Sequence, residues 1–228
     1  MLEILKKYLT QLEPDSNKNL NNNDELAYLA MTSKFEHPFR DKLALNLFKQ
    51  FKNNGKYVCR EWTPTKKQQT KDEKDEKTRR VDIAIIEGEN EPQCLIEVKA
   101  TNTQNGYGGF KDKKKLNHVE QHIQELIQQL LTWRKKSKFN DTKIYGILIA
   151  THPELPKIDP IYECMVRSCY KDPKDKDINE IKTAYENTVK NEKEIKNGTI
   201  SLVHDKQLNI GKFYNTPISL IVHILECN

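Results

Sequence analysis

The chain lacks the long apolar run that a membrane span requires. None of its apolar stretches approaches the ~20 residues that cross a bilayer as a helix. Its first twelve residues interleave charged with apolar side chains, unlike a secretory leader. The five cysteines are an odd number without a Cys-x-x-Cys pair, so neither a disulfide framework nor a structural zinc site is expected. We therefore expect a reduced, cytoplasmic protein with no membrane partner.

Motifs for nucleotides and for covalent catalysis are also missing. The sequence contains no Gly-x-x-x-x-Gly-Lys loop for phosphates and no Gly-x-Gly-x-x-Gly loop for dinucleotides. No arrangement of Ser or Cys with His and Asp predicts an activated nucleophile. Activity driven by a bound nucleotide, or by a Ser or Cys nucleophile, is therefore not expected.

The sequence does contain enough apolar residues for a core, in a highly charged chain. Hydrophobic residues make up 36% of the 228 residues and charged residues 31%. A chain of this length and composition can fold as one domain with a sizeable core. The 38 Lys and Arg exceed the 33 Asp and Glu by only five, so the net charge by itself identifies no partner.

The hydrophobic pattern predicts a mixture of helices and strands. Helical spacing of apolar residues predicts helices over residues 2–12, 25–31, 39–51 and 118–133. Alternating or continuous apolar runs predict strands over residues 56–62, 81–86, 94–101 and 143–151. One or two further helices are expected within residues 161–196, and the apolar segments 199–204 and 218–225 are of uncertain type. This order predicts an α/β (α+β) fold with a central mixed sheet of four to five strands flanked by helices.

Two neighbouring predicted strands carry charged side chains among apolar ones. Asp82 lies near the start of one strand, and Glu97 and Lys99 lie two residues apart on the next, so they point to the same face of the sheet. Burying such charges is costly unless they pair or bind a metal. Two carboxylates on adjacent strands can hold Mg²⁺, which polarises a phosphoryl oxygen and activates water, while a lysine stabilises developing charge. The pattern favours phosphodiester hydrolysis; a structural ion pair on a half-exposed sheet is the alternative.

Asp82, followed after a turn by Glu97-Val98-Lys99, resembles the motif of the PD-(D/E)XK nuclease superfamily. That superfamily includes many type II restriction endonucleases and DNA-repair nucleases. Its αβββαβ core carries the acid on the second strand and the (D/E)XK tripeptide on the third, which is the order predicted here. Val81 stands in place of the motif's proline, a departure that the superfamily often tolerates.

The resemblance implies a division of the chain. A restriction-endonuclease-like core is expected over residues 36–151, within a single domain that spans residues 1–228. Residues 1–35 are then an N-terminal helical elaboration, and residues 152–228 are a C-terminal elaboration.

The resemblance also implies roles for individual residues. Asp82 and Glu97 become ligands of Mg²⁺, which Mn²⁺ can replace, and the carbonyl of Val98 becomes a further ligand. Lys99 becomes the catalytic lysine. Many members use a Glu on the first core helix, and Glu36 is the expected match as a catalytic residue and metal ligand.

Weaker matches concern four other positions. Asp41 is the alternative to Glu36 on the first core helix, and Glu61 on the first strand is a further candidate. Some branches of the superfamily place a Gln on the second core helix with an aromatic residue four positions on. Gln129 and Trp133 suit that pattern, although this helix is rich in Gln.

The excess of positive charge lies directly after the predicted site. Residues 104–138 hold eight Lys and Arg against three acids. This excess of five positive charges equals the net charge of the whole chain. Glycines and aromatic rings in the first part of this window suit a mobile loop that stacks on bases. We expect DNA contacts there and from Arg79 and Arg80, which can clamp phosphates; a solvated loop is the alternative. The expected loop contacts are Tyr107, Lys111, Lys113, Lys114 and Lys115.

Together these features predict a metal-dependent DNA endonuclease of the type II restriction kind. We expect it to act as a homodimer, because cutting both strands of a symmetric site requires two active sites. Two other functions stay open. One is a repair or recombination nuclease that reads DNA shape, and the other is a non-catalytic nucleic-acid- or protein-binding module on the same fold.

Overall fold

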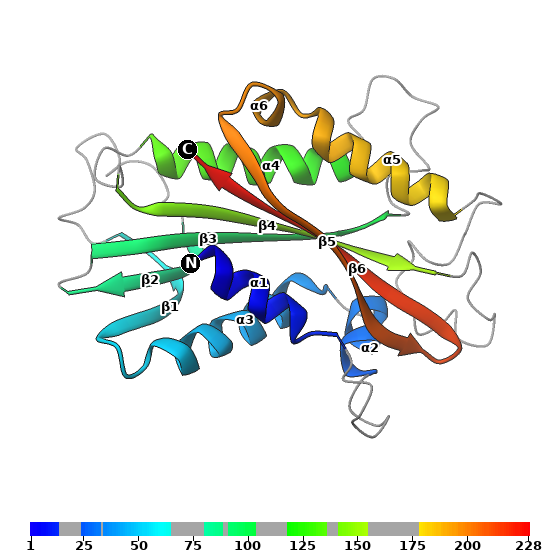
Figure 1. Cartoon of the computed structure of the whole chain (residues 1–228), viewed down its shortest axis with the longest axis horizontal. Helices are drawn as coiled ribbons and strands as arrows, with labels where there is room; N and C mark the ends of the chain where they lie inside the picture. The colour runs from blue at the N-terminus through cyan, green and yellow to red at the C-terminus, as the bar shows by residue number, and fades with distance from the viewer. Residues whose placement is uncertain are drawn as a thin grey trace.

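Figure 1 shows the computed structural model of the chain, which describes residues 1–13, 24–32, 34–64, 80–88, 91–103, 118–135, 141–154 and 178–228. The helices in these ranges are α1 (Leu2–Thr10), α2 (Glu25–Thr32), α3 (Glu36–Phe51), α4 (His118–Arg134), α5 (Ile178–Asn191) and α6 (Lys193–Lys196). The strands are β1 (Lys56–Trp62), β2 (Val81–Glu87), β3 (Glu91–Asn102), β4 (Lys143–Pro153), β5 (Ile200–Phe213) and β6 (Thr216–Cys227).

The strands form one mixed sheet in the order β1-β2-β3-β4-β6-β5. β1, β2 and β3 run as an antiparallel meander, whereas β3 and β4 are parallel and are connected through the segment that contains α4. β6 pairs antiparallel with β4, and β5 pairs antiparallel with β6. The predicted mixed α/β class is confirmed. The described sheet has six strands, however, so the expected four to five is wrong.

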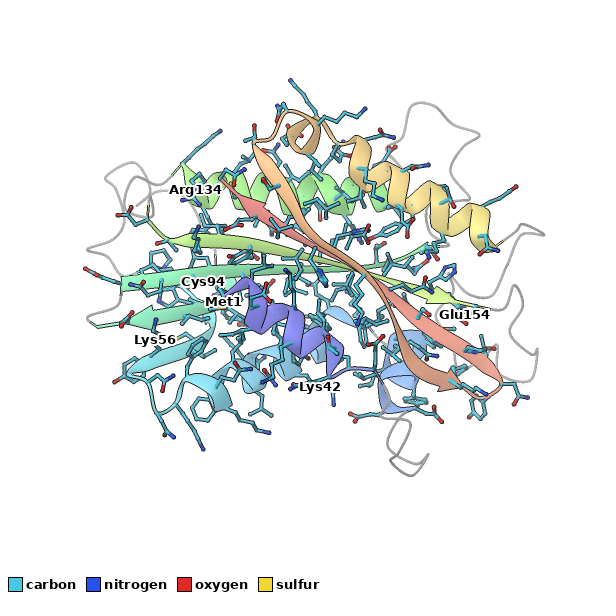
Figure 2. The ribbon with its side chains drawn as sticks, in the orientation of Figure 1. Met1, Lys42, Lys56, Cys94, Arg134 and Glu154 are labelled. Atoms are coloured by element: carbon cyan, nitrogen blue, oxygen red, sulfur yellow. The ribbon has the colours of Figure 1, made fainter. Side chains whose placement is uncertain are left out.

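Helices cover both faces of this sheet, with α1, α2 and α3 on one side and α4 and α5 on the other (Figure 1). α3 buries the apolar stripe Phe39, Leu43 and Leu47, each with no exposed surface, in a cluster that includes sheet residues such as Ile83 and Ile96. Figure 2 shows side chains from both helical layers filling the space against the sheet, with Lys56 and Glu154 near its opposite ends.

Differences from the sequence prediction include the start of α3 and the type of the C-terminal apolar segments. α3 begins at Glu36, three residues before the predicted start, and holds Pro38 in its first turn. Proline is tolerated there because the first helical N–H groups have no intrahelical partner. β5 and β6 are long strands, although the sequence left their segments unassigned.

The remaining findings concern residues 161–196 and the apolarity of the helices. Of residues 161–196, the predicted helices are seen as α5 and α6, and the part up to residue 177 lies outside the described residues. Within the described ranges, no helix combines the length and apolarity needed to cross a membrane.

α4 approaches β4 closely at Gly146. A Cβ atom added at Gly146 would lie 2.8 Å from Cδ1 of Leu130 and 3.2 Å from Cδ2 of Leu126. Both leucines are fully buried, so they have little room to move. The absent side chain therefore sets the distance between this helix and the strand beneath it.

We predict that Gly146→Ala lowers the free energy of unfolding by about 1–3 kcal/mol, the usual cost of overpacking a core. Urea denaturation followed by circular dichroism measures the change. Lys143→Ala, at an exposed position of the same strand, serves as the control and is expected to cost less than about 0.5 kcal/mol. An unchanged denaturation midpoint in Gly146→Ala would contradict the close packing.

A second buried feature is the polar side chain of His223 on β6. The residue has no exposed surface, and its ring lies 5.5 Å from that of Tyr185 on α5. Burial lowers the pKa of His223 to about 4; the Asp205 carboxylate, 3.4 Å from Nδ1, opposes this shift, and the charge of Lys190 adds to it. Burial likewise lowers the pKa of His152 to about 4.

These two histidines predict how stability depends on pH. Their folded pKa of about 4 lies below the ordinary value of 6.5, so the unfolded chain binds more protons between these limits. Each histidine should therefore lower the free energy of unfolding by about 1.4 kcal/mol per pH unit as the pH falls from 6.5 towards 4. Urea titrations at pH 7 and 5.5 should show a smaller loss for His223→Gln than for wild type; equal losses would show that His223 does not contribute.

Candidate functional site

The structure brings Asp82 and Glu97 together where β2 meets β3. The antiparallel register pairs Ile83 with Ile96, so Asp82, which precedes Ile83, lies opposite Glu97, which follows Ile96. Oδ2 of Asp82 accepts a hydrogen bond from the backbone N–H of Val98 at 2.8 Å. The Asp82 side chain is 17% exposed, and Glu97 is buried. Two carboxyl groups therefore lie side by side with little access to water.

The environment of Glu97 favours its neutral form in the metal-free protein. Burial, the charge of Asp82 and a hydrogen bond between the two carboxyl groups raise the pKa of Glu97 to about 8. Two groups oppose this shift: Trp133, whose Nε1–H donates to Oε1 at 2.8 Å, and the charge of Lys99. A cation between Asp82 and Glu97 would remove the repulsion that favours protonation.

The carboxyl groups of Asp82 and Glu97 suit some metal ions better than others. Among the residues that the structure describes, no group of three or more His, Cys, Asp or Glu side chains could hold a metal ion. Mg²⁺ commonly binds through one or two carboxylates and keeps several waters. Asp82 and Glu97 thus offer the two carboxylates that such a Mg²⁺ or Mn²⁺ site uses, whereas a structural zinc site needs four ligands. The carbonyl of Val98 stays a predicted further ligand.

Lys99 belongs to β3, and Glu36 on α3 lies against the same strand near these acids. Lys99 follows Glu97 by two residues, and its Nζ is 3.6 Å from Oε2 of Glu125 on α4. The N–H of Ala100 donates to Oε2 of Glu36 at 3.3 Å, which places this carboxylate one residue beyond Lys99. Glu36 completes no three-carboxylate metal group within the described ranges, so its role as a ligand stays a prediction.

Arg40 is the residue that sequence reasoning missed. Its side chain is only 7% exposed, and its guanidinium contacts three acids from three elements. Nη1 lies 3.2 Å from Oδ1 of Asp82, Nη2 lies 3.5 Å from Oε1 of Glu61, and Nε lies 3.4 Å from Oδ1 of Asp41. Burial alone would lower the pKa of Arg40, but hydrogen bonds and charges from Asp82 and Asp41 outweigh it and raise the pKa. The sequence did contain one signal for it: Arg40 lies on the predicted helix 39–51, one helical turn after Glu36.

Glu61 occupies a strained position opposite Asp82. Its φ is +49°, in the left-handed region that residues other than glycine adopt rarely. The ladder pairs Arg60 with Ile83 and the residue after Glu61 with Val81, so Glu61 faces Asp82 across the two strands. Such strain is found more often at functional sites than elsewhere.

The predicted DNA contacts are described only in part. Arg80 is 68% exposed, and its Nη1 lies 3.4 Å from Oε2 of Glu61, so it lies beside the acids. The other predicted contacts lie outside the described residues: Arg79, Tyr107, Lys111, Lys113, Lys114 and Lys115.

The two weaker predictions on α4 have different outcomes. Trp133 is buried, and the hydrogen bond that its Nε1–H donates to Glu97 places it in the site. Oε1 of Gln129 is buried and accepts no hydrogen bond from the part of the chain that the structure describes. The aromatic position of the predicted pattern therefore contacts the site directly.

Comparison of the chain with protein-family models, with curated proteins and with solved structures finds no match. What the site does must therefore be inferred from its residues and their geometry.

We predict that the side-chain carboxyl carbon of Glu97 titrates with a midpoint near pH 8 in metal-free protein. Asp82→Asn should lower this midpoint, because it removes a neighbouring negative charge, and Trp133→Phe should raise it, because it removes the Nε1–H donor. Carbon-13 NMR with labelled glutamate measures the midpoint, and Glu87→Gln, at an exposed position of β2 outside the site, is the control. A Glu97 midpoint near 4.5 in wild type would show that the two acids do not interact.

Proposed function

We propose that this chain is a Mg²⁺-dependent DNA endonuclease of the PD-(D/E)XK type with a restriction-endonuclease-like core. The observation that carries the proposal is the shielded pair Asp82 and Glu97, with Lys99 two residues further along the same strand. A pair of neighbouring carboxyl groups in which burial and repulsion favour protonation is a good site for a divalent cation. A solvated surface ion pair would not need the donors that surround these acids.

The order of elements supports the same proposal. α3, β1, β2, β3, α4 and β4 follow one another as in an αβββαβ core, and the acid and the Glu-x-Lys tripeptide lie on its second and third strands. β1 to β3 form a meander, and β3 and β4 are parallel. The elements on either side of this core, α1, α2 and the β5–β6 hairpin, pack onto its sheet.

Each site residue then has a task in phosphodiester hydrolysis. Asp82, Glu97 and the carbonyl of Val98 would hold the metal ion, which supplies Lewis-acid polarisation of the scissile phosphate and acidifies water when bound. Lys99 stabilises the charge that develops on the phosphoryl oxygens. Trp133 fixes the orientation of the Glu97 carboxylate through its N–H. Water adds to phosphorus, the P–O ester bond breaks, and a phosphate monoester and an alcohol result.

Charge placement supports DNA as the substrate. Residues 104–138 carry the whole net excess of five positive charges and follow the strand of Glu97 and Lys99. Arg80 adds an exposed cation beside the acids. A double-strand cut at a symmetric site requires two such centres, so a homodimer is part of the proposal.

We predict that the protein cleaves DNA with Mg²⁺ or Mn²⁺ and that Asp82→Asn and Lys99→Ala reduce the rate about 100-fold or more. Gel analysis of supercoiled plasmid and of branched and flapped oligonucleotides measures the rate and separates restriction from repair activity. Glu87→Gln and Lys143→Ala, at exposed positions of β2 and β4, are the matched controls and should keep wild-type rates.

Two results would count against this function. Equal cleavage by wild type and both site variants would place the activity elsewhere. Intact DNA with every substrate and either metal would favour the binding module, in which the charged residues form only a structural network.

A further inference from the structure

The two oxygens of Asp82 face different partners. Oδ2 lies against β3, where it accepts the N–H of Val98 at 2.8 Å, next to Glu97. Oδ1 contacts the guanidinium of Arg40, whose Nη1 is 3.2 Å away. One side of this carboxylate is thus available for a metal shared with Glu97, and the other side already has a cation.

Arg40 reaches this position because it is held by carboxylates from three elements. Besides Asp82 on β2, it contacts Glu61 on β1 and Asp41 on its own helix. The left-handed backbone at Glu61 is a cost that the fold bears at the position where that carboxylate meets the guanidinium. Since the Arg40 side chain is 7% exposed, it is unsuited to contact a substrate directly.

The charges in this half of the site balance without any added ion. Nη2 of Arg60 lies 2.8 Å from Oδ1 of Asp41, and Nη1 of Arg80 lies 3.4 Å from Oε2 of Glu61. Three acids are therefore matched by three arginines: Asp41, Glu61 and Asp82 by Arg40, Arg60 and Arg80. Glu97 lies on the other side of Asp82, and the Lys99 ammonium forms its ion pair with Glu125, so the acid directly beside Asp82 has no ion pair among the described residues.

We infer that Arg40 is a built-in cation that takes the place of a second metal ion, so that the site binds one divalent ion per chain. This inference rests on the proposed function. In two-metal nucleases, one carboxylate commonly lies between ions about 3.5–4 Å apart, each stabilising one side of the displacement. Here Asp82 would lie between one exchangeable ion, on the Glu97 side, and one permanent charge, on the Arg40 side. A guanidinium stays protonated in proteins, so this charge is permanent.

The proposal predicts the number of ions that the protein binds. Isothermal titration with Mn²⁺, together with electron paramagnetic resonance of unbound Mn²⁺, should give one ion per wild-type chain, and Glu97→Gln should abolish this binding. Arg40→Lys, which keeps the charge, should also bind one ion. Arg40→Met, which keeps the length but not the charge, should bind two, because Asp41, Glu61 and Asp82 then lack their shared cation.

A second variant decides the matter if Arg40→Met does not fold. Glu61→Gln removes an acid that would ligate a second ion but not the proposed single ion, so it should bind one ion with an affinity within about twofold of wild type. Two ions in wild type, loss of an ion in Glu61→Gln, or a folded Arg40→Met that binds only one would each overturn the role of Arg40. No Mn²⁺ binding by wild type would instead overturn the proposed function, and the one-ion inference with it.

Discussion

The shielded contact between the carboxyl groups of Asp82 and Glu97 is the constraint on which the rest of the site depends. Two acids that share a site with little water repel each other, and each needs donors or cations to remain charged. Neighbouring groups supply two donors and one cation: the N–H of Val98 from β3, the N–H of Trp133 from α4 and the guanidinium of Arg40 from α3. Burial and the charge of Asp82 nevertheless raise the pKa of Glu97 to about 8. Removing one partner of a buried ion pair typically costs about 3–5 kcal/mol, so these contacts bear on stability as well as on function.

The two helical layers support this contact from opposite faces of the sheet, because α3 begins and α4 ends near β2 and β3. α3 packs through its apolar stripe on one face, and its first turns bring Glu36 and Arg40 to the acids. α4 packs on the opposite face at the distance that Gly146 allows, and its last turn brings Trp133 to Glu97. The apolar packing of both helices thus fixes where the polar groups lie.

The strands of the site could be read from the sequence because their signals are local. Glu97 and Lys99 share a face by the period of two, and continuous apolar residues mark β2 and β3. Arg40 could not be found in this way, because its burial depends on Asp82, which lies 42 residues further along the chain. The β5–β6 hairpin was missed for a different reason: its turn places Tyr214 at φ +51°, where a glycine or asparagine would have signalled it.

A permanent and an exchangeable charge on either side of one carboxylate have different consequences. Arg40 compensates Asp82, Glu61 and Asp41 whether or not a metal is present, so the arrangement of α3, β1 and β2 does not depend on the metal. Glu97 accepts a hydrogen bond from Trp133 but has no ion pair within the described ranges, and burial and the charge of Asp82 raise its pKa. A metal ion would therefore act on the ionisation of Glu97 and leave the fold around it unchanged. For the proposed nuclease, activity therefore requires the metal, whereas the arrangement of strands and helices around Arg40 forms without it.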